Sequence, residues 1–342
     1  MIDRTRSYLQ AINEAIHLEM QNDPNVIILG EDIAGGIGMQ DQGVLDAWGG
    51  AFGSTKGLIK EFGFNRVLDT PISETAFLGA SVGAAVTGLR PIVEIMFVDF
   101  VAVCADQLFN QAAKMRYMFG GQVNCPITIK LTVGAGKGAA AQHSQFWAPL
   151  FTHIPGLKVI APATPYDMKG LLASAILDND PVVVLEHKAL FGNKGVVPQE
   201  RYTIPIGKGE VKLIGNDVSI VSFSKALNTC LEAAQKLSLD GINCEVIDLR
   251  SLSPLDETII LDSVKKTGRL IVVDESNPRC SLASDISSLV SEKGFYDLKA
   301  PIKNVTSRHT PVPYSPVLEH YYSPNTERIM ETVKDLLNVT VN

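Results

Sequence analysis

Cysteine is scarce and scattered in this chain. Its five cysteines are odd in number, and no two of them form a C-x-x-C pair. This spacing excludes a disulfide framework and a cysteine-based zinc site, and it favours reduced, buried thiols. The apolar run at 75–89 is too short and too rich in glycine for a membrane span, which needs about 20 apolar residues. We therefore expect a cytoplasmic protein with no membrane partner.

Positive charge is in deficit. The 30 lysines and arginines are outnumbered by 37 aspartates and glutamates, which gives a net charge of −7. This balance, with no cluster of basic residues, argues against a nucleic-acid surface. The six histidines are not paired at a spacing that would place two metal ligands on one helix face. The sequence therefore indicates small-molecule or protein partners.

Apolar residues are abundant and make up 46% of the 342 residues. This length and composition predict a large core and about two domains of roughly 150 residues each. Apolar segments of strand length alternate with segments of helical length on both sides of a stretch rich in Gly, Pro and charge. Near-continuous apolar strands are typical of parallel sheets. We therefore expect two doubly wound α/β domains, at 1–188 and 208–342, joined by a linker at 189–207.

The expected elements follow from this alternation. In the first half, strands are expected at 26–30, 66–70, 90–97, 125–133, 157–163 and 181–187. Helices are expected there at 4–20, 74–88, 100–118 and 165–178, the last capped by Thr164. In the second half, strands are expected at 218–224, 244–250, 269–276 and 301–306. Its helices are expected at 225–238, 255–266, 282–294 and 325–337.

Two glycine motifs match known signatures but lack their structural context. GAGKGA (134–139) follows an expected strand and matches the dinucleotide fingerprint, yet the next strand does not end in the acidic residue that binds ribose. GASVG (79–83) matches the hydrolase elbow, but Ser81 falls inside an expected helix. We interpret the first motif as a loop that allows close backbone approach and the second as a helix-packing stripe.

Two residues are candidates for a functional site. Glu74 opens an expected helix with Ser73 as its cap, a place where a carboxylate is usually a solvated charge that complements the helix dipole. It nevertheless follows a strand at the carboxyl edge of the sheet, where α/β proteins bind ligands, as do 97–100 and the 134–145 loop. His143 stands among small residues in AAAQHSQ. From the residues alone it is either a hydrogen-bonded core histidine or an exposed general acid–base.

A resemblance to one family runs along nearly the whole chain. It rests on these segments, in this order: GEDIAGG, DTPISETAFLGASVGAAVTGLRPIVEIMFVDF, KMRYMFGG, AAAQHSQ, PGLKVIAP, DNDPVVVLEHK and DLRSLSPLD. Together they resemble the β subunit of the thiamine diphosphate-dependent component of 2-oxo acid dehydrogenase complexes. DAWGGAFGSTKGL, FTHIPGLKVI and EHKALFG are most similar to the acetoin dehydrogenase branch. The resemblance implies a transketolase-like pyrimidine-binding domain followed by a transketolase C-terminal domain.

The resemblance also implies roles for individual residues. Glu74 is expected to contact the ring nitrogen of the cofactor's aminopyrimidine. A buried carboxyl there can share a proton, which helps the exocyclic amine to deprotonate the thiazolium carbon. Ile72 and Phe100 complete the implied cofactor-binding set. His143 is implied to be catalytic, because it can stabilise a developing oxyanion or pass a proton to the lipoyl sulfur.

One motif of thiamine diphosphate enzymes is missing, because no G-D-G string occurs in the sequence. The resemblance therefore implies that this chain binds only the pyrimidine half of the cofactor, while an α subunit binds the diphosphate and Mg2+. It implies a heterotetramer of two α and two β subunits, and a dihydrolipoyl acetyltransferase core with its lipoyl domain as a further partner. It also implies a potassium site, for which an ordinary DND turn is the alternative. The potassium ligands are expected at Ile127, Ala175, Ile176, Asp178 and Asp180.

The implied activity is that of an acetoin dehydrogenase component. Acetoin is cleaved to acetaldehyde and a hydroxyethyl group on the cofactor, which lipoamide oxidises and accepts as an acetyl group. The alternative within the family is a pyruvate dehydrogenase β subunit. Two rivals from other classes are a nicotinamide-linked oxidoreductase, based on GAGKGA, and a non-catalytic scaffold subunit.

Overall fold

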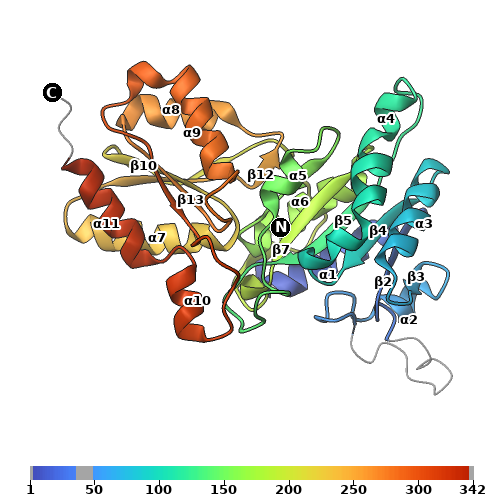
Figure 1. Ribbon diagram of the computed structural model, residues 1–342. Helices are drawn as coiled ribbons and strands as arrows, with labels where there is room; N and C mark the ends of the chain where they lie inside the picture. The colour runs from blue at the N-terminus through green and yellow to red at the C-terminus, as the bar shows by residue number, and fades with distance from the viewer. Residues whose placement is uncertain (1–2, 36–48, 339–342) are drawn as a thin grey trace. The chain divides into compact units, whose positions relative to one another are not determined.

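The chain forms two units whose residues are interleaved along the sequence (Figure 1). The computed structural model describes residues 3–35 and 49–338. The first unit comprises Met1–Val133, Phe151–Glu186 and Leu190–Ile206, and the second comprises Gly134–Leu150, His187–Ala189 and Gly207–Asn342. Two stretches that the predicted boundaries place in the first domain or the linker, 134–150 and 187–189, therefore group with the second unit.

The first unit is built on a parallel sheet. Its strands lie in the order β6-β7-β5-β4-β2-β3, and the pairings of β2 with β3 and β4, of β4 with β5, and of β6 with β7 are parallel. Every residue of β5 and β7 is buried, as expected for strands covered on both faces. All six strands predicted from the apolar runs are present, β2 with its predicted bounds and the others in shorter form: β2 (Val26–Gly30), β3 (Val67–Asp69), β4 (Arg90–Ile95), β5 (Thr128–Val133), β6 (Lys158–Ile160) and β7 (Val182–His187).

The helices of the first unit bury their apolar faces in one core. α1 packs against α6, and Ile12 of α1, Leu171 of α6 and Ile28 of β2 are fully buried together. α6 begins as predicted, because the Thr164 side chain accepts a hydrogen bond from the Asp167 N–H. The regular helices are α1 (Tyr8–Asn22), α2 (Leu58–Phe62), α3 (Glu74–Val86) and α6 (Pro165–Leu177).

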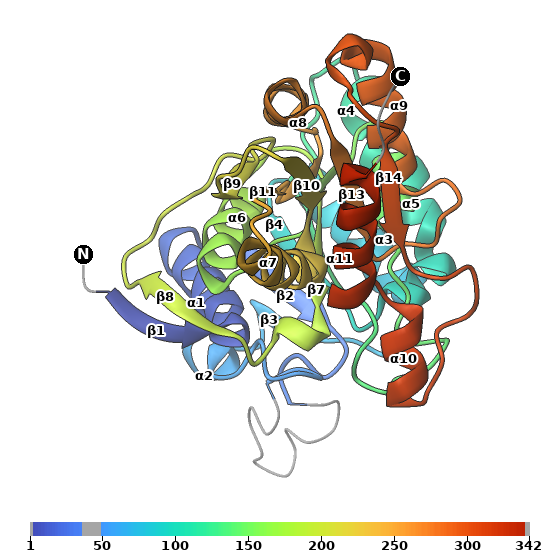
Figure 2. The same ribbon diagram turned by 90° about the vertical axis from the view of Figure 1, so that its left-hand side faces the viewer.

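The helix predicted at 4–20 is wrong over its first turn. Asp3–Ser7 forms strand β1, which pairs antiparallel with β8 (Lys194–Pro198) inside the predicted linker (Figure 2). Both arginines of β1 form an ion pair with Glu14 at 2.7 Å. Alternate residues of a strand point to the same face, so Arg4 and Arg6 can both reach Glu14. This strand pairing replaces the helical turn that the sequence pattern predicts here.

The single helix predicted at 100–118 is also wrong. The segment is divided into the short elements η2 (Val98–Cys104), η3 (Gln107–Gln111), η4 (Ala112–Lys114) and α4 (Met115–Met118). The residues just before β6 include a further short helix that the sequence does not predict, α5 (Ala148–Thr152).

The second unit is built on a mixed sheet in the order β14-β13-β10-β11-β9, in which only the edge pairing of β9 with β11 is antiparallel. Figure 1 shows α8 and α9 on one side of this sheet and α7 and α11 on the other. The strands of this sheet are β9 (Glu210–Leu213), β10 (Val218–Ser222), β11 (Cys244–Asp248), β13 (Leu270–Asp274) and β14 (Lys303–Thr306). The short strand β12 (Ser251–Ser253) is not part of it. The helices are α7 (Ser224–Leu239), α8 (Glu257–Thr267), α9 (Leu282–Lys293), η6 (Phe295–Asp297), α10 (Pro316–Tyr322) and α11 (Thr326–Leu337).

The five cysteines are free thiols, and four of them are buried. Burial raises the pKa of each of these four to about 12, which keeps them protonated and unreactive at neutral pH. The expectation of buried thiols is wrong for Cys280, which is exposed. Over residues 3–35 and 49–338, no helix is both long enough and apolar enough to cross a membrane.

A buried row of charges crosses the first sheet. Glu94 of β4 lies in register with Lys130 of β5, and the lysine Nζ is 2.6 Å from Glu94 Oε2 and 3.6 Å from Glu186 Oε1 on β7. Ser54 Oγ donates a further hydrogen bond to Glu94 at 2.9 Å. Burial raises the pKa of Glu186 to about 7, although the charge of Lys130 opposes this shift. One ammonium is therefore shared by two carboxyl groups inside the protein.

Candidate active site

Glu74 occupies the first turn of α3, as the sequence predicts. It is only 7% exposed, so it is a buried carboxyl group and not a solvated charge. Thr75 Oγ1 donates a hydrogen bond to the Val103 carbonyl at 2.7 Å, which fastens the start of α3 to η2. The predicted cap is wrong, because the Ser73 side chain makes no capping hydrogen bond. The Ser73 backbone, at φ −159° and ψ 73°, departs from the extended conformation found at Ser7 and Thr164, which do cap their helices.

A second buried carboxyl group, Glu31, lies close enough to Glu74 for their charges to interact. Burial, followed by the charges of Glu74 and Asp32, raises the pKa of Glu31 to about 7. Asp69, at the end of β3, accepts a hydrogen bond from the Ala34 N–H at 2.5 Å, which holds the loop after β2 on the edge of the sheet. Sequence reasoning misses Glu31, although GED directly after a strand is the same signal that identifies Glu74.

The two carboxyl groups define what this region can do chemically. Burial and the nearby charge of Glu74 raise the pKa of Glu31 to about 7, so the Glu31 carboxyl group keeps its proton up to near-neutral pH. Such a pair can donate a hydrogen bond from one oxygen and accept one at another. It therefore suits a ligand that presents both a basic ring nitrogen and an amino group.

Phe100 belongs to a row of aromatic rings. Phe100 is part of η2, which packs against α3. Its ring meets Phe97 edge-on at a centroid distance of 5.8 Å, and Phe97 meets Phe52 in the same way at 5.6 Å. These edge-to-face pairs fix the orientation of the rings. Ile72, two residues before Glu74, is 85% exposed. Ile72 and Glu74 therefore lie at the beginning of α3, and Phe100 lies on η2, the element that packs against this helix.

The GAGKGA segment is a loop, as the sequence predicts, but it groups with the second unit and not with the first. Gly134, Gly136 and Gly138 have φ of 92°, 96° and 63°, and no helix begins before Ala148. The dinucleotide fingerprint requires a helix directly after its glycines, so this loop does not form that site. Gly134 is also required for steric reasons, because a Cβ there would lie 1.9 Å from His187 Nε2.

His143 lies farther along the same loop and is partly exposed. Ala140 has a φ of 59°, and its carbonyl accepts a hydrogen bond from the His143 N–H at 3.4 Å, which forms a tight turn before the imidazole. A left-handed backbone disfavours bulky side chains, which explains the small residue at this position. The partial exposure of His143 favours the acid–base interpretation over a core histidine.

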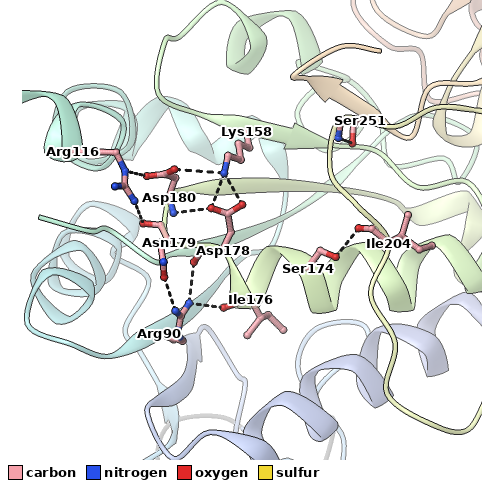
Figure 3. A network of polar contacts seen from close by, with 11 residues as sticks. Arg90, Arg116, Lys158, Ser174, Ile176, Asp178, Asn179, Asp180, Ile204 and Ser251 are labelled. Atoms are coloured by element: carbon pink, nitrogen blue, oxygen red, sulfur yellow. Dashed lines mark hydrogen bonds and ion pairs between the residues drawn. The ribbon is translucent and has the colours of Figure 1, made fainter. Parts of the chain in front are cut away.

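Figure 3 shows three residues of the implied potassium site, Ile176, Asp178 and Asp180, around the end of α6. Lys158 Nζ contacts the two carboxylate oxygens of Asp178 at 2.7 and 2.6 Å. Asp180 forms an ion pair with Arg116 and lies 3.5 Å from Lys158 Nζ. The side-chain oxygens of both aspartates are therefore neutralised by basic groups of the chain itself.

The backbone oxygens of this set are partly engaged as well. Arg90 donates hydrogen bonds to the carbonyls of Ile176 at 3.1 Å and Asp178 at 2.9 Å. The Ile127 and Ala175 carbonyls accept main-chain hydrogen bonds from the N–H groups of Val182 and Asp178. Because a carbonyl oxygen has two lone pairs, each of these can accept one more partner. A cation would thus bind here through carbonyl groups and not through the aspartate side chains.

Two domain families match the sequence. The family described as "Transketolase, pyrimidine binding domain" matches residues 4–194, and "Transketolase, C-terminal domain" matches residues 207–329. A solved structure titled "Split gene transketolase, inactive beta4 tetramer" has the same fold, with a TM-score of 0.79 over 98% of this chain and 99% of its own. At 22% identity this likeness concerns the fold alone.

Curated relatives match over almost their full length. The "Acetoin:2,6-dichlorophenolindophenol oxidoreductase subunit beta" of Bacillus subtilis (strain 168) is 56% identical, over 98% of this chain and 98% of its own. The protein of the same name from Cupriavidus necator is also 56% identical, over 95% and 96%. This chain belongs to the transketolase-like dehydrogenase β subunits. The "Pyruvate dehydrogenase E1 component subunit beta" of Bacillus subtilis is a more distant member, at 41% identity over 96% and 98%.

Family membership confirms the resemblance and the fold class, because both predicted α/β domains correspond to a transketolase domain. The exact domain boundaries and the individual site residues stay predictions.

Proposed function

We propose that this chain is the β subunit of a thiamine diphosphate-dependent acetoin dehydrogenase component. With an α subunit, it cleaves acetoin, releases acetaldehyde and passes an acetyl group to lipoamide. The observation that supports this substrate is the difference in identity, 56% to the acetoin-named β subunits and 41% to the pyruvate-named subunit of Bacillus subtilis. The alternative is a pyruvate dehydrogenase β subunit.

The residues of the first unit fit the pyrimidine half of thiamine diphosphate. Once bound, this cofactor supplies the carbon nucleophile that attacks the substrate carbonyl. Glu74 would hold a proton against the ring nitrogen of the aminopyrimidine, and the nearby Glu31, with its pKa of about 7, would add a second carboxyl group. Phe100 offers an aromatic face and Ile72 an exposed apolar side chain to the ring, and both exclude water from it.

His143 acts on the substrate in this proposal. A partly exposed imidazole can stabilise negative charge on the substrate oxygen, or pass a proton to the lipoyl sulfur. The small residues before it leave room for a bound molecule to approach the backbone of the loop.

The proposed partners follow from the family and from the missing G-D-G motif. An α subunit binds the cofactor diphosphate through Mg2+, and two α and two β subunits form the working enzyme. A dihydrolipoyl acetyltransferase core presents the lipoyl domain that accepts the acetyl group. We place this assembly in the cytoplasm.

Potassium binding is proposed through carbonyl groups, because Lys158 and Arg116 already neutralise Asp178 and Asp180. A bound cation stabilises the folded state, so we expect Tm to be about 2–4 °C higher in KCl than in NaCl at equal ionic strength. Because the Asp180 side chain is not a ligand in this arrangement, Asp180→Asn should preserve the difference between the two salts. Equal Tm values in both salts would count against the site.

Product analysis of the reconstituted α–β pair tests the substrate. With acetoin, thiamine diphosphate, Mg2+ and an electron acceptor, we expect one acetaldehyde for each acceptor reduced, and a higher kcat/KM for acetoin than for pyruvate. A preference for pyruvate with release of CO2 would overturn the substrate assignment and support the alternative. Tight binding of NAD by the chain alone would support the nicotinamide-linked rival.

A further inference from the structure

Lys188 fastens both ends of the loop that carries His143. Its side chain is buried at the start of the short turn η5 (Lys188–Leu190). The ammonium group donates hydrogen bonds to the carbonyls of Gly134 and His143, the latter at 2.5 Å, and to Ser144 Oγ at 3.2 Å. A main-chain hydrogen bond from the Gly134 N–H to the Gln145 carbonyl, at 3.0 Å, also joins the two ends of this loop. One ammonium group thus ties the beginning of the loop to its end.

Two carboxylates of the second unit hold the first half of this loop. Glu275 accepts a hydrogen bond from the Ala135 N–H at 2.9 Å. Glu319 accepts from the N–H groups of Gly136 and Gly138 at 2.9 and 3.0 Å. Both carboxylates are buried, and hydrogen bonds to ionised groups are stronger than those between neutral groups. The backbone from Ala135 to Gly138 is therefore fixed independently of Lys188.

His187 keeps the first of these carboxylates ionised. Burial alone would raise the pKa of Glu275, but His187, at 2.9 Å, together with Lys225 and the Ala135 N–H, lowers it to about 2. Glu275 therefore stays charged at working pH, and the loop remains anchored at its first residues. What is left to fix is the segment after Gly138, which contains the turn at Ala140 and the imidazole.

We propose that Lys188 is a positioning residue for His143. This inference rests on the proposed function, in which His143 acts on the substrate. By binding the His143 carbonyl, Lys188 fixes the position of the His143 Cα. It therefore limits the positions that the imidazole ring can reach. A displacement of about 1 Å at a reacting group can lower a rate on the order of a hundredfold. Loss of the hydrogen bonds from Lys188 should therefore have a large effect on turnover.

A double-mutant cycle in the reconstituted α–β enzyme tests this role. We expect Lys188→Met to lower kcat on the order of a hundredfold, while the cofactor concentration for half-activation changes less than about twofold. In a His143→Ala background the same change should alter kcat less than about twofold, because its effect passes through His143. Equal fold-losses in the two backgrounds would overturn the proposal, since a purely structural effect would add to the loss of His143.

Lys169→Met is the matched control. Lys169 is also buried, and its ammonium group donates to the carbonyls of Pro198 at 2.6 Å and Gln199 at 3.1 Å, in the first unit. Its loss should lower stability, as that of Lys188 does, but leave kcat within about twofold of the wild-type value. A kcat loss as large as that of Lys188→Met would show that losing any buried lysine suffices, and would overturn the proposal.

If Lys188→Met does not fold, Lys188→Arg tests whether Lys188 positions His143. Its guanidinium keeps the charge but moves the donors, so we expect a smaller fall in kcat and faster hydrogen exchange at the backbone of residues 143–145. Wild-type kcat together with faster exchange there would overturn the proposal. A wild-type pair that cleaves pyruvate and not acetoin would contradict the proposed substrate only, and the cycle would then be run with pyruvate.

Discussion

Glu74→Gln, assembled with its α subunit, is expected to lower kcat a hundredfold or more, which corresponds to a barrier about 3 kcal/mol higher. Glutamine fills the same buried place at the start of α3 but cannot hold a transferable proton against the ring nitrogen of the cofactor. The glutamine side chain also removes one of the two charges that, after burial, raise the pKa of Glu31. The measurement is acetaldehyde release at saturating cofactor, with the cofactor dissociation constant determined separately.

Glu257→Gln is the matched control for this substitution. Glu257 opens α8 as Glu74 opens α3, but its side chain is 44% exposed and forms an ion pair with Lys293 at 2.5 Å. Exposed ion pairs contribute little, so this variant should keep kcat within about twofold of the wild-type value. If Glu74→Gln were equally active, the chain would be a scaffold and the proposed chemistry would be wrong.

Lys130→Met is expected to lower the free energy of unfolding by about 3–5 kcal/mol. The substitution removes the only ammonium group that the structure places within ion-pair distance of Glu94 and Glu186 in the described part of the chain. Both carboxyl groups are buried, so neither can recover the lost interaction from water. Denaturant unfolding at neutral pH, compared with wild type in the same buffer, measures the effect.

Lys236→Met provides the control for lost lysine charge. Lys236 lies on α7 and pairs with Glu232 at 2.7 Å, four residues away on an exposed face. Such an exposed pair contributes little to stability, so its loss should barely move the unfolding curve. A Lys130→Met variant as stable as this control would show that the buried row does not stabilise the sheet.

Local sequence patterns predict much of the fold. The strands of both sheets follow from apolar runs, and the start of α6 follows from Thr164, whose cap depends on a residue three positions away. β1 escapes prediction because its pairing depends on β8, far along the chain, and on the ion pairs of its arginines with Glu14. A helical pattern that begins in the same segment conceals it.

The site residues also fall into those that the sequence predicts and those that only the fold reveals. Glu74 is identifiable because it follows a strand at the edge of a parallel sheet. The altered proton affinity of Glu31 depends on burial and on Glu74, neither of which its own neighbours in the sequence reveal. The clamp on the His143 loop brings Lys188 to Gly134 and Glu275 to Ala135, across 54 and 140 residues. Only the folded chain brings these groups together.

Acetaldehyde release by the purified chain, measured without and then with its α subunit, tests the central claim most directly. In the presence of acetoin, thiamine diphosphate, Mg2+ and an electron acceptor, the chain alone should give no turnover, and adding the α subunit should start it. Sustained acetaldehyde release by the chain alone would contradict the claim that it provides only half of the cofactor site.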